Sequence, residues 1–198
     1  MRERVLQAAM QMLASDGVAE FTTRRLASQA HTSAPAVYEL FGDKAGVVRE
    51  VFFEGFRALG RRLEAMTPSG DPRSDLVGVI RVLRVFVREN PVLAELMFSR
   101  PFADFDPGPA ERQAGDEVRE FIVATVRRCI EAGVLAGDAT DIAHVLVALA
   151  HGLVRQETAG WLGSSQTSVD RRWDLAVTAV LRGLCPPPDG GSVTSSRR

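Results

Sequence analysis

The sequence predicts an all-α protein of nine helices. Apolar residues recur at the three- and four-residue spacing of amphipathic helices along most of the 198 residues. Segments rich in glycine and proline interrupt this pattern, no segment has the character of a strand, and no internal repeat is present. The expected helices span residues 3–15, 22–30, 33–41, 44–65, 74–89, 92–98, 111–132, 141–162 and 168–184.

The stretch 22–44 predicts two short helices joined by a tight turn. Thr22 and Ser33 are residue types that cap helices, because a side-chain hydroxyl accepts a hydrogen bond from a free amide in the first turn. Pro35 is tolerated in the first turn, where no amide partner is lost. Only His31 and the residue after it remain for the connection. Two helices joined in this way form a helix-turn-helix, whose second helix enters the major groove of DNA.

A long helix follows this motif directly and leads into a helical body. Residues 44–65 carry a continuous apolar stripe, and the segment TPSGDP at 67–72 breaks the pattern clearly. Residues 99–113, with three prolines and a glycine, predict a surface loop. The C-terminal segment cannot build a core and is expected to be a disordered tail. The expected domains are residues 1–43, 44–184 and 185–198.

The helix expected at residues 141–162 is apolar on nearly every side. A helix that is hydrophobic all round is buried on more than one face. In a chain of this size a second subunit is a natural cover for the second face. The pattern therefore favours a homodimer that packs through this helix and the helix after it.

Composition and charge exclude several classes of protein. No apolar stretch reaches the roughly 20 residues that cross a bilayer, and the N-terminus indicates an amphipathic helix, not a signal peptide. We therefore expect a cytoplasmic protein with no membrane partner. Cys129 and Cys185 are too few and too distant for a metal cluster or disulfide framework. The net charge is −1, and residues 1–50 hold six basic and six acidic residues, which counts against strong non-specific binding to nucleic acid.

The order and spacing of the N-terminal features resemble the TetR family of bacterial transcriptional regulators. The resemblance runs from about Val5 to Phe53 and includes the first helix VLQAAMQMLASDG, the Thr22 cap, the recognition segment with Tyr38 and Phe41, and the Asp43-Lys44 entry to a fourth helix. The segments ELMFSRPFADFDP and ALAHGLVRQETAGWL resemble the C-terminal body of one TetR subgroup. The resemblance implies that helices 1–3 bind DNA and that helices 4–9 form a ligand-binding and dimerisation body.

Several side chains of the motif are candidates for contact with DNA. Small residues at the start of the second motif helix are placed to meet base edges, although they also serve simply to start the helix. The resemblance implies phosphate contacts at Tyr38 and Lys44, where the alternative is ordinary surface packing. Thr22 and Arg24 are further phosphate candidates. The full set expected to contact DNA is Thr22, Arg24, Thr32, Ser33, Ala34, Pro35, Tyr38 and Lys44.

Three residues depart from the family pattern. His31 stands where a glycine is usual, and a left-handed conformation there costs a non-glycine residue free energy, although histidine tolerates it better than most. We expect the turn to survive. Ala34 replaces a longer polar residue, and Glu39 replaces an aromatic residue or histidine. A carboxylate near phosphates is repulsive unless it accepts a hydrogen bond from a cytosine amine.

In the body, two groups of residues are candidates for function. His144 and His151 lie seven residues apart on one helix face, which leaves three interpretations: core histidines, dimer-face histidines, or the lining of an inducer cavity. A metal site would need more ligands. The residues expected for an inducer cavity are Phe86, Met97, Phe121, Thr125, His144 and His151. The residues expected at the dimer interface are Val145, Leu149, Gly152, Trp173, Val177, Val180 and Leu181.

These observations favour a DNA-binding transcriptional regulator, a ligand-responsive repressor that binds a near-palindromic operator as a homodimer. The alternative is an all-α small-molecule-binding or scaffold protein whose DNA binding is weak or vestigial. No catalytic triad, phosphate-binding glycine loop or paired-carboxylate motif is present, so we expect no enzyme, no catalytic residue and no cofactor or metal.

Overall fold

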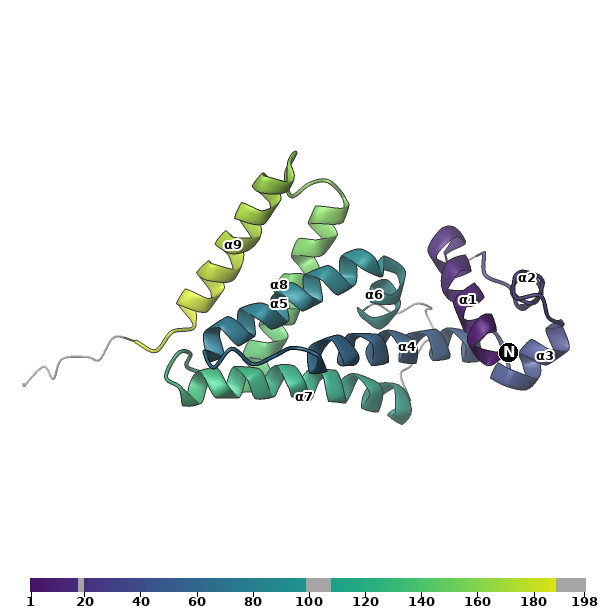
Figure 1. The fold of residues 1–198 in the computed structure, drawn as a ribbon, viewed down its shortest axis with the longest axis horizontal. Helices are drawn as coiled ribbons and strands as arrows, with labels where there is room; N and C mark the ends of the chain where they lie inside the picture. The colour runs from purple at the N-terminus through teal and green to yellow at the C-terminus, as the bar shows by residue number, and fades with distance from the viewer. Residues whose placement is uncertain (18–19, 99–107, 188–198) are drawn as a thin grey trace, which may run out of the picture. The chain divides into compact units, whose positions relative to one another are not determined.

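The computed structural model in Figure 1 describes residues 1–17, 20–98 and 108–187. The described residues form nine α-helices, so the predicted all-α fold is confirmed. Their bounds are α1 Arg2–Asp16, α2 Thr23–Gln29, α3 Ala34–Phe41, α4 Lys44–Glu64, α5 Pro72–Glu89, α6 Pro91–Phe98, α7 Pro109–Glu131, α8 Ala139–Thr158 and α9 Gln166–Gly183.

Helix ends differ from the prediction by up to four residues, and each difference has a local cause. Helices α5, α6 and α7 begin at Pro72, Pro91 and Pro109, because proline needs no amide partner in a first turn. Residues 109 and 110, which belong to the expected loop and precede the expected helix, are therefore helical, whereas residues 99–107 lie outside the described residues. Helix α8 stops at Thr158, four residues early, because Gly160 follows with a φ of 76°.

The described chain divides into two compact units. Unit 1 contains residues 1–67 and 81–121, and unit 2 contains residues 68–80 and the chain from 122 onward. In unit 1, α4 packs against α1, α3 and α6. The expected boundary after residue 43 therefore has no matching division in the packing and stays a prediction. The expected tail at 185–198 lies mostly outside the described residues.

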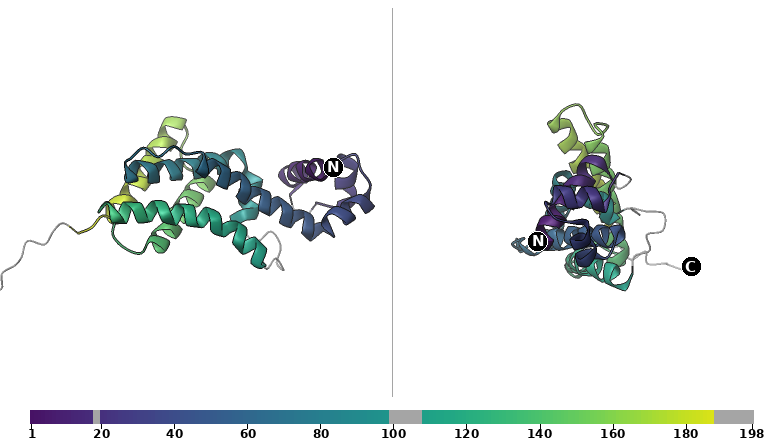
Figure 2. Two further views of the ribbon diagram at one scale, coloured as in Figure 1. Left: turned by 60° about the horizontal axis from the view of Figure 1, so that its bottom comes forward. Right: turned by 90° about the vertical axis from the view of Figure 1, so that its right-hand side faces the viewer.

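In unit 2, α8 and α9 pack on each other. Figure 2 shows the ribbon in two further views. Within unit 2, Leu146, Val154 and Leu181 are almost fully buried. The indole nitrogen of Trp173 donates a 2.7 Å hydrogen bond to the Glu157 carboxylate. Cys129, predicted to be a buried thiol, is buried. Burial raises the pKa of this thiol.

None of the described helices combines the length and apolar character needed to cross a membrane. Within the same residues, no group of three histidine, cysteine or carboxylate side chains is close enough to hold a metal ion.

Candidate nucleic-acid interface

Helices α2 and α3 form a helix-turn-helix whose two caps are those that the sequence predicts. Thr22 Oγ1 accepts a hydrogen bond from the amide of Arg25, and Ser33 Oγ accepts one from the amide of Ala36, each at 3.3 Å. His31 lies between the helices with a φ of 48°, the left-handed conformation that we expected it to tolerate.

Burial of one face fixes the orientation of α3. Val37 is almost fully buried, and so are Phe21, which precedes α2, and Leu26 on α2. Because α3 buries the side of Val37, the next residue faces outward: the Tyr38 side chain is 50% exposed. The Tyr38 hydroxyl lies 3.1 Å from Thr23 Oγ1, which steadies the ring while leaving the hydroxyl a free hydrogen-bonding position.

The start of α4 adds a cation and a helix N-terminus. Asp43 caps this helix by accepting a 2.7 Å hydrogen bond from the amide of Gly46. Lys44 follows the cap, with its Nζ atom 6.0 Å from the centroid of the Phe21 ring. Helix N-termini favour anions, because free amides and the helix dipole point towards them. A phosphate would meet both the lysine and this N-terminus here.

The two neighbouring arginines of α2 have different surroundings. Arg25 donates to the Glu20 carbonyl oxygen at 3.0 Å and forms an ion pair with Asp16, so it holds the motif together. Arg24 is exposed and has no such partner among the described residues, which leaves its guanidinium available for a phosphate.

The remaining candidates at the start of α3 have short side chains that extend little beyond the backbone. Pro35 is exposed and Ala34 is half-buried. Ser33 already accepts the cap hydrogen bond, and Thr32 Oγ1 lies 3.5 Å from the sulfur of Met1. These side chains sit at the exposed edge of the motif, and any direct contact they make with bases is short-range. Glu39, also exposed, adds a negative charge to the same helix.

A ladder of ion pairs runs from α3 along α4. Arg2 donates to the Leu40 carbonyl oxygen at 3.2 Å, lies over the Phe41 ring and pairs with Glu50 at 2.6 Å. Glu50 also pairs with Arg57 at 2.9 Å. Arg57 then pairs with Glu54 at 3.0 Å, and Glu54 pairs with Arg61 at 2.9 Å. Partial burial alone would raise the pKa of Glu54, but hydrogen bonds from Arg61 and Arg57 hold it below its ordinary value.

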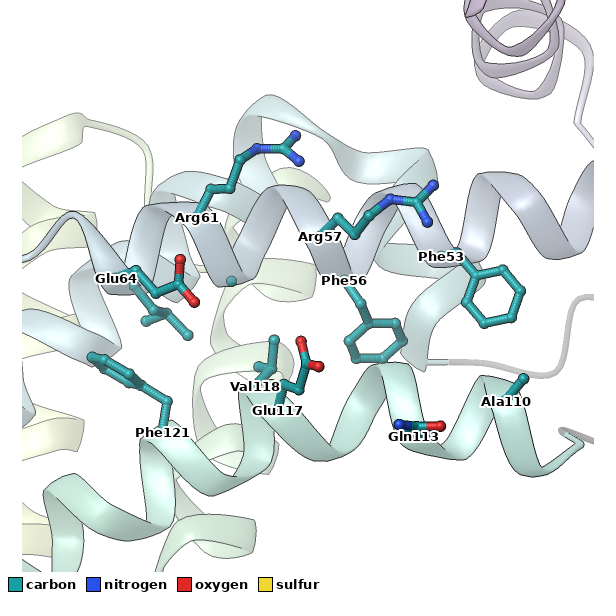
Figure 3. Close-up of a pocket in the computed structure, with 12 residues that line it drawn as sticks. Phe53, Phe56, Arg57, Arg61, Glu64, Ala110, Gln113, Glu117, Val118 and Phe121 are labelled. Carbon is teal, nitrogen blue, oxygen red and sulfur yellow. The ribbon is translucent and has the colours of Figure 1, made fainter. Parts of the chain in front are cut away.

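The far end of this ladder reaches a groove between α4 and α7, which we call the α4–α7 groove. Its volume is about 460 Å³. Figure 3 shows aromatic and aliphatic side chains of both helices pointing into it. The lining residues are Phe53, Phe56, Arg57, Gly60, Arg61, Leu63, Glu64, Ala110, Gln113, Glu117, Val118 and Phe121.

Only one residue of the expected inducer cavity, Phe121, lines this groove. Phe86 and Met97 are buried in the core of unit 1, and Thr125 is buried in unit 2. His144 is exposed with its Nδ1 atom 2.8 Å from the Thr140 carbonyl oxygen, and His151 is half-buried. The expected set is therefore divided between the two units, three residues in each, and Phe53 and Phe56, which do line a groove, are absent from it.

The residues expected at the dimer interface differ in how far they are buried in the single chain. Trp173, Val177 and Leu181 are buried inside the single chain, where they cover α8, and they have little surface left for a partner. The accessible members on α8 and α9 are Val145, Leu149, Gly152 and Val180. Leu175 on α9, which is 67% exposed, was not in the predicted set.

Two family models match the chain. The model of the bacterial regulatory proteins of the tetR family matches residues 5–51, and that of the tetracyclin repressor-like C-terminal domain matches residues 76–180. The first match contains the helix-turn-helix and the start of α4. The second covers more than half of the chain and contains most of the helical body.

Individual relatives agree with these matches. The tetracycline repressor protein class A from transposon 1721 of Escherichia coli is 30% identical over 156 residues, which are 79% of this chain and 66% of that protein. A protein of unknown function from Rhodococcus sp. RHA1 has a TM-score of 0.81 at 27% identity, over 93% of this chain and 95% of that one. The TetR family transcriptional regulator PfmR from Thermus thermophilus shares the fold, with a TM-score of 0.71 at 20% identity over 92% of this chain and 100% of that one.

Proposed function

Because the chain belongs to the TetR family of DNA-binding transcriptional regulators, we propose that it is a repressor that binds its operator as a homodimer and releases it when a small molecule binds. TetR regulators are not enzymes, as the sequence led us to expect. The observation that carries the proposal is the exposed face of α3, held by two capped helices and a buried Val37. Such a protein works in the cytoplasm, where its operator lies.

The proposed contacts divide into phosphate and base contacts. Tyr38, Lys44, Thr22 and Arg24 would bind phosphates and set the register of α3 on the duplex. The four residues Thr32, Ser33, Ala34 and Pro35 would approach base edges, where a methyl group or ring can pack on a thymine methyl. Because few long polar side chains reach the bases, sequence-dependent DNA shape would contribute much of the selectivity.

A homodimer would supply a second recognition helix. One short helix, α3, contacts only a few base pairs, so a second copy of α3 is needed for a specific site. Dimers of helix-turn-helix proteins place their recognition helices about 34–36 Å apart, in successive major grooves of a near-palindromic site. Three residues of unit 2 offer apolar surface: Val145 on α8 and Leu175 on α9 are exposed, and Leu149 on α8 is half-buried. We propose that this surface packs against its copy in a second subunit.

The ladder of ion pairs supports a mechanical link from ligand to DNA. Arg57 and Arg61 line the α4–α7 groove, and their partners Glu54 and Glu50 lead back to Arg2, which holds the end of α3. A ligand that shifts α4 would therefore move α3, the proposed recognition helix. The coupling is reciprocal, so operator DNA must weaken ligand binding by the same factor by which ligand weakens DNA binding.

A second function remains in view, namely an all-α ligand-binding or scaffold protein with vestigial DNA binding. Two observations favour it: the equal numbers of acidic and basic residues in positions 1–50, and the exposed Glu39 on α3. Selection of bound fragments from a random DNA pool separates the two functions. A repressor is expected to enrich a near-palindromic sequence, whereas equal affinity for scrambled DNA would refute specific regulation.

Two substitutions then test the proposed phosphate contacts on the selected operator. Lys44→Ala is expected to weaken binding and to reduce the slope of log K against log salt by about 0.9, because one fewer phosphate is neutralised. Tyr38→Phe removes only a neutral hydroxyl and is expected to weaken binding by about 3- to 10-fold with an unchanged slope.

Arg127→Ala is the control, since it removes one exposed positive charge from α7 in unit 2. Salt-dependent binding curves by fluorescence anisotropy provide the measurement. If Lys44→Ala and Tyr38→Phe both bind like the wild type, the proposed phosphate contacts of these two residues are refuted.

A further inference from the structure

The α4–α7 groove has the size and the lining of a small-molecule site. Its volume of about 460 Å³ lies within the range of pockets that hold small ligands. Three phenylalanines, Phe53, Phe56 and Phe121, contribute aromatic surface to it. Phe56 is held in place by neighbouring rings, with its centroid 4.9 Å from that of Phe52 and 6.4 Å from that of Phe98. The aromatic wall is therefore preorganised.

The charges that remain unpaired in the groove are negative. Arg57 and Arg61 belong to the lining, but their guanidinium groups pair with Glu50 and Glu54, which lie outside it. In Figure 3 both guanidinium groups point away from α7. Glu64 on α4 and Glu117 on α7 have no ion-pair partner among the described residues.

Figure 3 also shows the position of these two carboxylates. Glu64 and Glu117 extend into the space between α4 and α7, beside Phe56, Val118 and Phe121. Two carboxylates on opposite walls therefore flank an aromatic surface. A positive charge is stabilised by both components, through Coulomb attraction to the carboxylates and through cation–π attraction to the ring faces.

We propose that the α4–α7 groove binds a lipophilic organic cation, a ligand with an aromatic or aliphatic body and a permanent or protonated nitrogen or phosphorus centre. The apolar body gains free energy by leaving water against the phenylalanines. An anion of the same shape meets two carboxylates and finds both arginines already paired. This inference rests on the proposed function in one respect: it takes the ligand of the groove to be the effector that acts on α4.

A pair of ions with the same shape and opposite charge tests this assignment. Tetraphenylphosphonium and tetraphenylborate are titrated separately into the full-length protein without DNA, and heat is measured by isothermal titration calorimetry. Tetraphenylphosphonium is expected to bind with one site per chain and at least tenfold more tightly than tetraphenylborate. Equal affinity for the two ions, tighter binding of the anion, or no binding of the cation would overturn the proposal.

Substitutions locate the site. The double variant Glu64→Gln and Glu117→Gln keeps the shape of both side chains and removes both charges, and it is expected to lower the affinity for tetraphenylphosphonium by about tenfold. Glu131→Gln, at the exposed end of α7 outside the groove, is the matched control and is expected to bind like the wild type. An unchanged affinity in the double variant would overturn the assigned site.

A separate measurement distinguishes this proposal from the proposed function. Operator binding is measured with and without tetraphenylphosphonium at a saturating concentration. If the cation binds at the groove but leaves operator affinity unchanged, the binding site stands and its role as the effector site is refuted. If no operator is found at all, the calorimetric result still decides the ligand class.

Discussion

A single added methyl group at Gly46 tests how tightly α3 and α4 are joined. Gly46 lies in the first turn of α4, where its amide donates to the capping carboxylate of Asp43. A Cβ atom added there would lie 1.8 Å from the carbonyl oxygen of Phe41, the last residue of α3. Real contacts of this kind do not fall below 3.0 Å, so the backbone must move by roughly 1.2 Å.

The size of the effect follows from two opposing terms. Overpacking of this kind costs about 1–3 kcal/mol, and the upper end applies because the clashing atom belongs to the backbone and cannot turn aside. Alanine in place of glycine in a helix adds about 1 kcal/mol to the free energy of unfolding, because alanine has the higher helix propensity. We therefore expect Gly46→Ala to lower the free energy of unfolding by about 2 kcal/mol, or the melting temperature by about 4–8 °C.

Gly60 on the same helix provides the matched control. A Cβ atom there would lie 3.9 Å from the nearest Val118 methyl group, an ordinary contact. Gly60→Ala is therefore expected to stabilise the protein by about 0.5–1 kcal/mol. Urea unfolding followed by circular dichroism gives both values, at equal subunit concentration because assembly contributes to the stability of an oligomer.

Operator binding at a temperature where both variants are folded completes the test. Gly46→Ala displaces Phe41 and with it the end of the reading helix, so its operator affinity is expected to fall at least tenfold, while Gly60→Ala binds like the wild type. A Gly46→Ala variant that melts at or above the wild-type temperature would refute the reasoning, because it would show that α3 and α4 separate at no cost.

Two further predictions concern single residues of unit 1. His31→Gly is expected to raise the free energy of unfolding by up to about 1 kcal/mol, because glycine adopts the φ of 48° without strain; a loss of stability in urea unfolding would mean that the imidazole makes a stabilising contact. Glu54 has a lowered pKa in the folded state, so its stabilising effect is present above its unfolded pKa of 4.5 and is lost as the pH falls through the lower folded value. The wild-type protein therefore loses stability between pH 7 and pH 4, and Glu54→Gln is expected to reduce this loss by about 1 kcal/mol or less, since the ion pairs are partly exposed. Urea titrations at several pH values measure the free energy of unfolding of both proteins. The same pH dependence in both proteins would contradict this prediction.

The N-terminal motif could be predicted from the sequence because its signals are local. Thr22 and Ser33 cap helices within three residues of themselves, and the structure confirms both caps. The outward position of Tyr38 follows from the burial of its neighbour Val37 in the same helix turn. Each of these inferences needs only helix geometry, which does not depend on the rest of the chain.

The faces of the body helices could not be assigned in the same way. Periodicity shows that one side of α9 is apolar, but it does not show what covers that side. Trp173, Val177 and Leu181 are predicted at the dimer interface, and this stays a prediction. In the single chain all three are buried, and Trp173 also hydrogen-bonds Glu157. Leu175, on the other side of α9, is the exposed apolar residue.

The α4–α7 groove was missed for a related reason. Phe53 and Phe56 are part of the long apolar pattern of α4. The sequence does not show which helix packs against α4, so the pattern alone indicates that both are core residues. The groove exists because α7, distant in sequence, lies along α4 and brings Gln113, Glu117 and Phe121 opposite them. Pairing between distant helices depends on tertiary packing, which periodicity does not encode.

Helix α4 carries residues of both proposed sites of unit 1, and its length limits how the two sites are coupled. Lys44 stands at its first position and Glu64 at its last, so the proposed phosphate contact and the groove lie on one rigid element. The exposed ion pairs of the ladder each contribute about 1 kcal/mol or less, which is too little to store a large conformational change. A ligand that only rearranged Arg57 and Glu54 would therefore alter operator affinity by a factor of at most about five. A stronger effect requires movement of α4 as a whole, and Gly46, where α4 meets the backbone of Phe41, is the point at which such a movement would reach α3.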